Sequence, residues 1–170
     1  MNNYSKQRDW ENSKHDLIKK ELSKILSPCG SEEYHHVFEE APKQMDCEEC
    51  TDLIDHKNRR YGLRIRNANN YQKVPDSWLS EITIRSKTAY NAETEITKIQ
   101  KGFLDYYFYC WLHNNEIMQY HFLDAKKLLP LLKKYKNLSR KIINRSDNTE
   151  GIAYSVEHLQ DAIIRSKYEH

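Results

Sequence analysis

Residues 51–86 read TDLIDHKNRRYGLRIRNANNYQKVPDSWLSEITIRS and contain three short runs of strand-forming residues, at 51–55, 61–66 and 80–85. In the second and third runs apolar and charged side chains alternate, which is typical of strands with one buried and one polar face. Turn-forming residues separate the runs, so we expect an antiparallel meander. Its polar face would carry three guanidinium groups, those of Arg64, Arg66 and Arg85.

The flanking sequence predicts helices that cover this meander. An amphipathic helix is expected at 5–26 and a short strand at 33–38. After the meander, a helix at 91–101 should end at Gly102, and the almost wholly apolar run 103–112 should form a buried central strand. The order of these elements predicts an α+β fold, with helices packed on the sheet.

The remaining residues predict one more strand and two more helices. Residues 113–116 should turn the chain into a partner strand at 117–123. A helix should begin at Asp124 and be interrupted or kinked by Pro130. The last predicted helix, at 156–167, has an apolar stripe.

The composition and the length are typical of a single domain with a hydrophobic core. The chain has 170 residues, of which 38% are hydrophobic and 31% charged. We expect a single α+β domain at 1–135. Residues 136–170 would be a basic connector and a C-terminal helix packed on that domain or on a partner.

Charge is distributed unevenly along the chain. Residues 32–55 hold nine acids and one lysine, whereas residues 126–145 hold eight bases and no acid. This asymmetry predicts an acidic edge and a basic edge. Neither a signal peptide nor a membrane span is recognisable, so we expect a cytoplasmic protein with no membrane contact.

The cysteines do not predict a zinc site. Cys47 and Cys50 have the spacing of half a zinc site, with Cys29, His35 and His36 upstream. No second pair completes the pattern, and the two glutamates between the thiols disfavour thiolate formation. We therefore expect reduced cysteines and no zinc.

Signature motifs of three enzyme classes are missing. The sequence has no glycine-rich phosphate-binding loop, no Gly-x-Ser-x-Gly and no His-Glu-x-x-His. P-loop nucleotide hydrolysis, serine hydrolysis of that type and zinc proteolysis therefore have no support.

The stretch from Asp52 to Leu123 resembles the core of the PD-(D/E)XK nuclease superfamily in the order of its elements. In that family an acid on one strand and an acid-x-lysine on the next hold Mg²⁺ and direct a water at a phosphodiester. The resemblance implies a restriction-endonuclease-like core, with Asp52 as the first acid and Arg66 at the lysine position. Arg64 stands where the second acid would be. The same stretches are similar to uncharacterised proteins of phages and mobile elements.

An active nuclease would need an acid from another position, because a guanidinium beside Mg²⁺ repels it and the ion prefers several carboxylate oxygens. Glu81, Glu95 or Glu21 could supply an oxygen, and Lys98 would share the helix face of Glu95. The alternative for Glu95 and Lys98 is an exposed helical ion pair. The candidate catalytic residues are thus Asp52, Glu81, Glu95 and Lys98, and the candidate Mg²⁺ ligands are Asp52 and Glu95.

The arginines could also bind nucleic acid without a metal, by contacting phosphates. Tyr71 or Tyr135 would be available for base stacking. The residues expected to bind nucleic acid are Arg64, Arg66, Arg85, Lys133, Lys134 and Arg140. Alternatively, the arginines are buried and form a structural network with Asp46, Asp52 and Glu81.

Three functions are consistent with these patterns. The first is a divergent nuclease-like protein that binds DNA or RNA without cleaving it. The second is an active Mg²⁺-dependent nuclease with migrated acids. The third is a small accessory or anti-defence protein that binds a protein partner through residues 32–55 or through the C-terminal helix.

Overall fold

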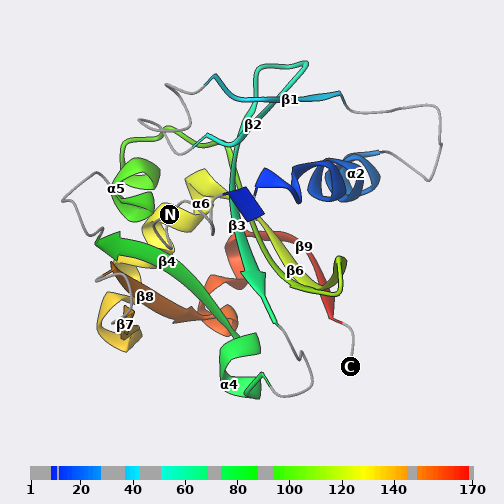
Figure 1. Cartoon of the computed structure of the whole chain (residues 1–170). Coiled ribbons are helices and arrows are strands. Elements are labelled where there is room, and N and C mark those ends of the chain that lie inside the picture. The colour runs from blue at the N-terminus through cyan, green and yellow to red at the C-terminus, as the bar shows by residue number, and fades with distance from the viewer. Residues whose placement is uncertain are drawn as a thin grey trace.

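The computed structural model describes residues 9–10, 12–27, 37–42, 51–68, 74–87, 94–144 and 149–168. They form two β-sheets, with helices packed around them (Figure 1). The first sheet has the strand order β1-β2-β3-β5-β6-β9, and the second has the order β4-β8-β7. The α+β class predicted from the sequence is therefore confirmed.

The strands of the six-stranded sheet are β1 (Phe38–Glu40), β2 (Leu53–Asp55), β3 (Arg60–Asn67), β5 (Tyr106–His113), β6 (Glu116–Asp124) and β9 (Ile163–Tyr168). Those of the second sheet are β4 (Glu81–Lys87), β7 (Arg140–Asn144) and β8 (Thr149–Ser155). The helices are α2 (His15–Leu26), α4 (Asp76–Leu79), α5 (Glu95–Gln100), α6 (Ala125–Lys134) and the 3₁₀ helices η3 (Lys136–Leu138) and η4 (Val156–Ala162).

The first helix covers one face of the six-stranded sheet. Ile18 and Leu22 of α2 are fully buried and pack in one cluster with Leu53 and Phe108. The predicted helix at 5–26 is confirmed over 15–26, because its apolar stripe has a sheet face to bury against. Its predicted start at 5–8 lies outside the described residues, as does most of the strand expected at 33–38.

The predicted meander is correct for two of its three runs. β1, β2 and β3 pair antiparallel in chain order, but the run at 80–85 forms β4 in the second sheet. The neighbour of β3 is instead β5, which runs parallel to it. Residues 107–112 of β5 are buried on both faces, so this strand takes a central position that the amphipathic β4 could not fill. The parallel pairing requires a crossover, which contains α5.

The second face of the large sheet packs against the small sheet and α6. Tyr107, Tyr109 and Trp111 of β5 join Ile82 and Ile84 of β4 in one buried cluster. Leu128 and Leu132 of α6 belong to the same cluster. The strip of β3 and β5 that faces this cluster therefore lies in the interior, between the two sheets.

Local turn and cap signals behave as the sequence predicts. Asn114 and Asn115 have φ values of 48° and 63°, the left-handed conformation of a tight hairpin turn. Asp124 caps α6 by accepting hydrogen bonds from the N–H groups of Lys126 and Lys127. The interruption predicted at Pro130 is wrong, because α6 continues through this residue to Lys134.

The predicted C-terminal helix at 156–167 is wrong. Residues 156–162 form the 3₁₀ helix η4, which packs on α6, and residues 163–168 form β9, which pairs antiparallel with β6. The apolar residues Leu159 and Ala162 are buried, but a spacing of three fits a 3₁₀ helix as well as an α-helix. The following Ile163 and Ile164 are β-branched, and Ile163 pairs with Leu123 of β6 where the register shifts.

The predicted basic connector likewise contains β7 and β8, which pair with each other and join β4. In the described ranges, every helix is too short or too polar to cross a membrane.

Candidate functional site

The carboxylate of Glu95 is the centre of a buried polar cluster between the sheets. Its Oε1 accepts a hydrogen bond from Nη1 of Arg64 at 3.1 Å. Its Oε2 accepts from the backbone N–H of Arg85 and from the hydroxyl of Tyr107, both at 3.0 Å. Three elements, β3, β4 and β5, thus converge on the first turn of α5, and Thr94 caps that turn by accepting from the N–H of Thr97.

Glu95 remains ionised although it is buried. Burial on its own would raise the pKa of the carboxyl group, and it is the largest single effect. The charges of Arg64 and Arg85 and the hydrogen bonds from Arg85 and Tyr107 together outweigh it, so the pKa lies below its ordinary value. Both oxygens already accept from protein donors, and the charge of the Arg64 guanidinium, 3.1 Å from Oε1, disfavours a Mg²⁺ ion at Glu95.

Asp52 lies next to this cluster, just before β2. Its Oδ2 accepts a hydrogen bond from the backbone N–H of Leu63 at 2.6 Å, and its own N–H donates to the carbonyl of Tyr61 at 2.9 Å. The side chain therefore acts as an acceptor in the pairing of β2 with β3. This places Asp52 beside the residue that precedes Arg64.

Glu81 does not join Glu95. It begins β4 and forms an ion pair with Arg140, whereas Glu95 binds the N–H of Arg85 at the other end of the same strand. Four residues of extended chain separate these points by about 13 Å. Lys98 lies one helical turn after Glu95 and is buried, so the exposed Glu95–Lys98 ion pair considered as an alternative is wrong.

The three arginines do not form one exposed sheet face, and that expectation is wrong. Arg85 is on the second sheet, and the side chain of Arg64 is 14% exposed and paired with Glu95. The alternative of a structural arginine network is correct for Arg64, although its partner is Glu95 rather than Asp52 or Glu81. Asp46 lies outside the described residues.

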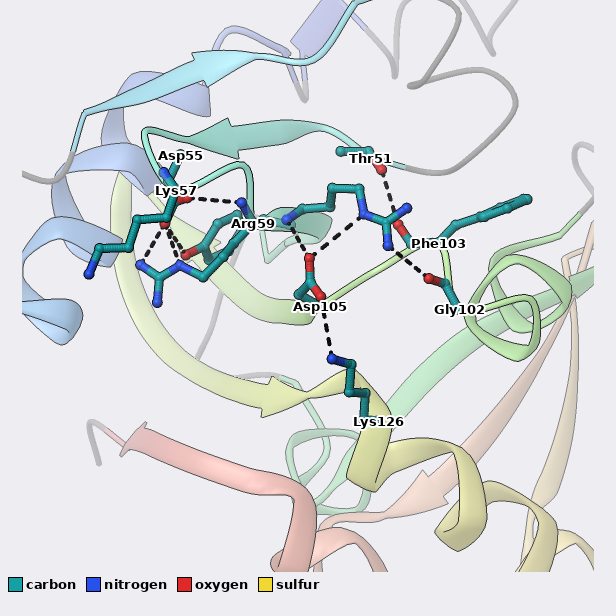
Figure 2. A network of polar contacts seen from close by, with 10 residues as sticks. Thr51, Asp55, Lys57, Arg59, Gly102, Phe103, Asp105 and Lys126 are labelled. Carbon is teal, nitrogen blue, oxygen red and sulfur yellow. Dashed lines mark hydrogen bonds and ion pairs between the residues drawn. The ribbon is translucent and has the colours of Figure 1, made fainter.

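A second polar network surrounds the hairpin between β2 and β3 (Figure 2). Asp55 accepts hydrogen bonds from the N–H groups of Lys57 and Arg59, from Nε of Arg59 and from the hydroxyl of Tyr61. Burial opposes the ionisation of Asp55, yet these donors lower its pKa. Both oxygens of Asp55 accept from neighbours within the hairpin, so this network stabilises the turn.

Asp105, also drawn in Figure 2, joins that hairpin to α6. Its Oδ2 accepts from the backbone N–H of Arg60 at 3.0 Å, and Nζ of Lys126 approaches Oδ1 at 3.9 Å. Arg60 also donates to the carbonyl of Gly102 at 2.9 Å. This chain of contacts fixes the start of α6 beside the sheet.

The exposed side of α6 and η3 is basic. Of its lysines, Lys126 approaches Asp105 and Lys134 lies near enough to Asp161 to feel its charge; no ion pair within 4 Å involves the lysines other than Lys126 in the described part of the chain. They are Lys127, Lys133, Lys134 and Lys136. Tyr135, which the sequence offered for base stacking, instead stacks on His158 with ring centres 4.4 Å apart. Tyr71 lies outside the described residues.

Sequence reasoning missed a buried histidine on β6. His121 is fully buried, and burial lowers its pKa to about 4. Its Nε2 lies 3.0 Å from Nε2 of Gln119, which also donates to the carbonyl of Leu79 at 2.6 Å. Because an amide nitrogen only donates, Nε2 of His121 must accept and Nδ1 must carry the proton.

That proton assignment decides what Ser166 can do. Nδ1 of His121 lies 2.9 Å from the hydroxyl of Ser166 on β9 and donates to it. The histidine therefore cannot remove the serine proton from this position, and the pair is no activated nucleophile. The network instead connects β6, β9 and the end of α4. An alternating strand pattern gives no signal for such a network, because its partners come from distant segments.

Among the described residues, no three His, Cys, Asp or Glu side chains come together as metal ligands would. Cys29, Cys47 and Cys50 lie outside these residues. No protein-family model matches the sequence, and no curated protein is significantly similar to it.

Proposed function

We propose that this protein binds DNA or RNA through the lysine-bearing surface of α6 and η3, and that it does so without cleaving the strand. The observation that carries this proposal is the row of lysines on one exposed surface, of which Lys127, Lys133, Lys134 and Lys136 form no ion pair with a described residue. Lysines without an acidic partner suit a phosphate backbone, because each phosphate that they contact releases counterions.

The buried cluster supports the absence of cleavage. What supports a nuclease-like fold is the resemblance of residues 52–123 in the order of their elements; in this stretch β3 and β5 pair in parallel, and β4 and α5 lie between them in the chain. At the position of that family's second acid stands Arg64, and it neutralises Glu95. A fixed guanidinium at this point disfavours a divalent cation. A divergent, inactive nuclease-like fold is the interpretation we favour, in the cytoplasm of a host cell of a phage or mobile element.

The test compares two charge reversals of equal size. Lys133→Glu with Lys134→Glu changes the proposed surface, and Lys20→Glu with Lys24→Glu makes the same change of net charge on α2. Binding to a labelled DNA duplex and to a single-stranded RNA is measured over a salt series. The first variant should bind more weakly, and its salt slope should fall by about one for each phosphate that it no longer binds. The α2 variant should bind as the parent does.

The same preparations decide between the three functions. Equal weakening in both variants, or no binding by the parent, would overturn the proposal and favour a protein partner at the acidic residues 32–55. Strand cleavage that requires Mg²⁺ and disappears in Asp52→Asn, with binding retained, would establish the nuclease alternative.

A further inference from the structure

We propose that Arg66 and Trp111 bind one phosphate-type oxyanion between the two sheets. This site is separate from the lysine surface of α6, and it rests on other observations. It goes beyond the proposed function because it assigns a discrete ligand to the interior face of β3 and β5.

The two side chains are neighbours on one face of the sheet. Arg66 and Trp111 are Cα partners in the parallel pairing of β3 with β5. Trp111 belongs to the cluster between the sheets, whereas Leu63 and Ile65 of β3 pack in the cluster under α2. Since side chains alternate along a strand, Arg66 points to the same side as Trp111.

Both side chains have a buried donor with no acceptor. Trp111 is 7% exposed, and its indole Nε1–H makes no hydrogen bond to any residue that the structure describes. Nε of Arg66 is likewise buried and has no hydrogen-bond partner within the described ranges. Buried N–H groups in native proteins almost always have an acceptor, and two adjacent orphans point to a ligand with several lone pairs.

Several neighbouring acceptors already bind other donors. In the same row of the sheet, Gln119 donates to Leu79 and to His121, so the Leu79 carbonyl and Nε2 of His121 are occupied. The nearby carboxylate of Glu95 accepts from Arg64, Arg85 and Tyr107. These acceptors bind other donors, and both Nε of Arg66 and Nε1 of Trp111 stay unsatisfied among the described residues.

The charge of the cluster selects the type of anion. Arg64, Arg66 and Arg85 carry three positive charges, and the Glu95 carboxylate supplies one negative charge against Arg64 and Arg85. A phosphate carries up to two negative charges and has more acceptor sites than a carboxylate. Arg66 is partly exposed, whereas its Nε and the indole nitrogen of Trp111 are buried, so the ligand would enter along the Arg66 side chain.

The indole N–H of Trp111 reports directly on the ligand. The chain has three tryptophans, and Trp111→Phe identifies which indole cross-peak in a ¹H–¹⁵N spectrum belongs to Trp111. Inorganic phosphate is titrated against sodium chloride of equal ionic strength. We expect the Trp111 indole proton to move downfield with a saturable dependence on phosphate, while the Trp10 and Trp78 peaks stay in place.

Arg66→Gln should abolish this shift, whereas the exposed Lys20→Gln control should retain it. Titration with a short oligonucleotide, with and without a 5′-phosphate, distinguishes the sources of the ligand. A shift with inorganic phosphate assigns the site to a free phosphate. A shift with only the 5′-phosphorylated oligonucleotide assigns it to a nucleic-acid terminus.

No shift with any of the three titrants, or an equal shift in Arg66→Gln, would overturn the proposal. The lysine variants of α6 should leave the inorganic-phosphate shift unchanged, so failure of one proposal does not decide the other.

Discussion

Nη1 of Arg64 on β3 lies 3.1 Å from Oε1 of Glu95 on α5, and both side chains are largely buried. This pair fastens the crossover helix to the strand that precedes it. Removing one partner would leave a buried charge uncompensated, which typically costs more than the pair contributes when intact.

Glu95→Gln should therefore lower the free energy of unfolding by about 3 kcal/mol or more, as should Arg64→Met. The double variant should be destabilised by less than the sum of the two single variants, because neither charge is then left alone. Urea unfolding of all four proteins gives the coupling energy. Additive effects would show that the two side chains do not interact in solution.

His121 should make stability depend on pH. The unfolded chain binds a proton at the ordinary histidine pKa near 6.5, whereas the folded chain does so only at about 4. Stability is therefore complete above about pH 6.5 and should fall about tenfold in the folding equilibrium constant per pH unit on the way down to 4. Unfolding curves at a series of pH values measure this slope.

The matched variants for this experiment are His121→Asn and His56→Asn. The first should flatten the slope between pH 6.5 and 4.5, and the second, at an exposed turn position, should keep it. If both variants retain the parental slope, another group is responsible for the pH dependence.

Gly102 should tolerate asparagine better than alanine. Its φ of 74° is in the left-handed region, and a Cβ at this position would meet no atom within 4 Å. The cost of Gly102→Ala is therefore conformational and should be about 1 kcal/mol, with Gly102→Asn costing less. Thermal unfolding compares the two, and equal destabilisation would show that something other than backbone conformation is responsible.

A chain that ends after Ala162 should no longer unfold cooperatively. It lacks β9, which pairs with β6 and supplies the Ser166 partner of His121. A chain that ends after Tyr168 keeps β9 in full and serves as the control. Near-ultraviolet circular dichroism and urea unfolding distinguish the two. A cooperative transition of parental stability in the shorter chain would mean that β9 contributes little.

Local sequence signals were sufficient for several elements. The alternation of 61–66, the apolar run at 103–112, the paired asparagines of the hairpin and the cap at Asp124 each have a short-range physical cause. They correspond to β3, β5, the Asn114–Asn115 turn and α6.

Partner choice could not be predicted in the same way. The pattern of residues 80–85 shows that one face is buried, but it does not say against which strand. The prediction therefore assigns residues 80–85, which form β4, to the same sheet as β3. It also expects Arg85 and Arg64 on one face of that sheet, which is wrong. Glu95 has the sequence context of an exposed helix start, and its burial depends on tertiary contacts with Arg64 and Tyr107.

The pairing of β6 with β9 has a consequence for synthesis in the cell. β7, β8 and η4 lie between these two strands in the chain, so β6 emerges from the ribosome long before its neighbour exists. Until then the nascent chain exposes the unpaired N–H and C=O groups along one edge of β6, which invites association with other chains. Chaperone dependence during translation should therefore fall once residues 163–168 have been made.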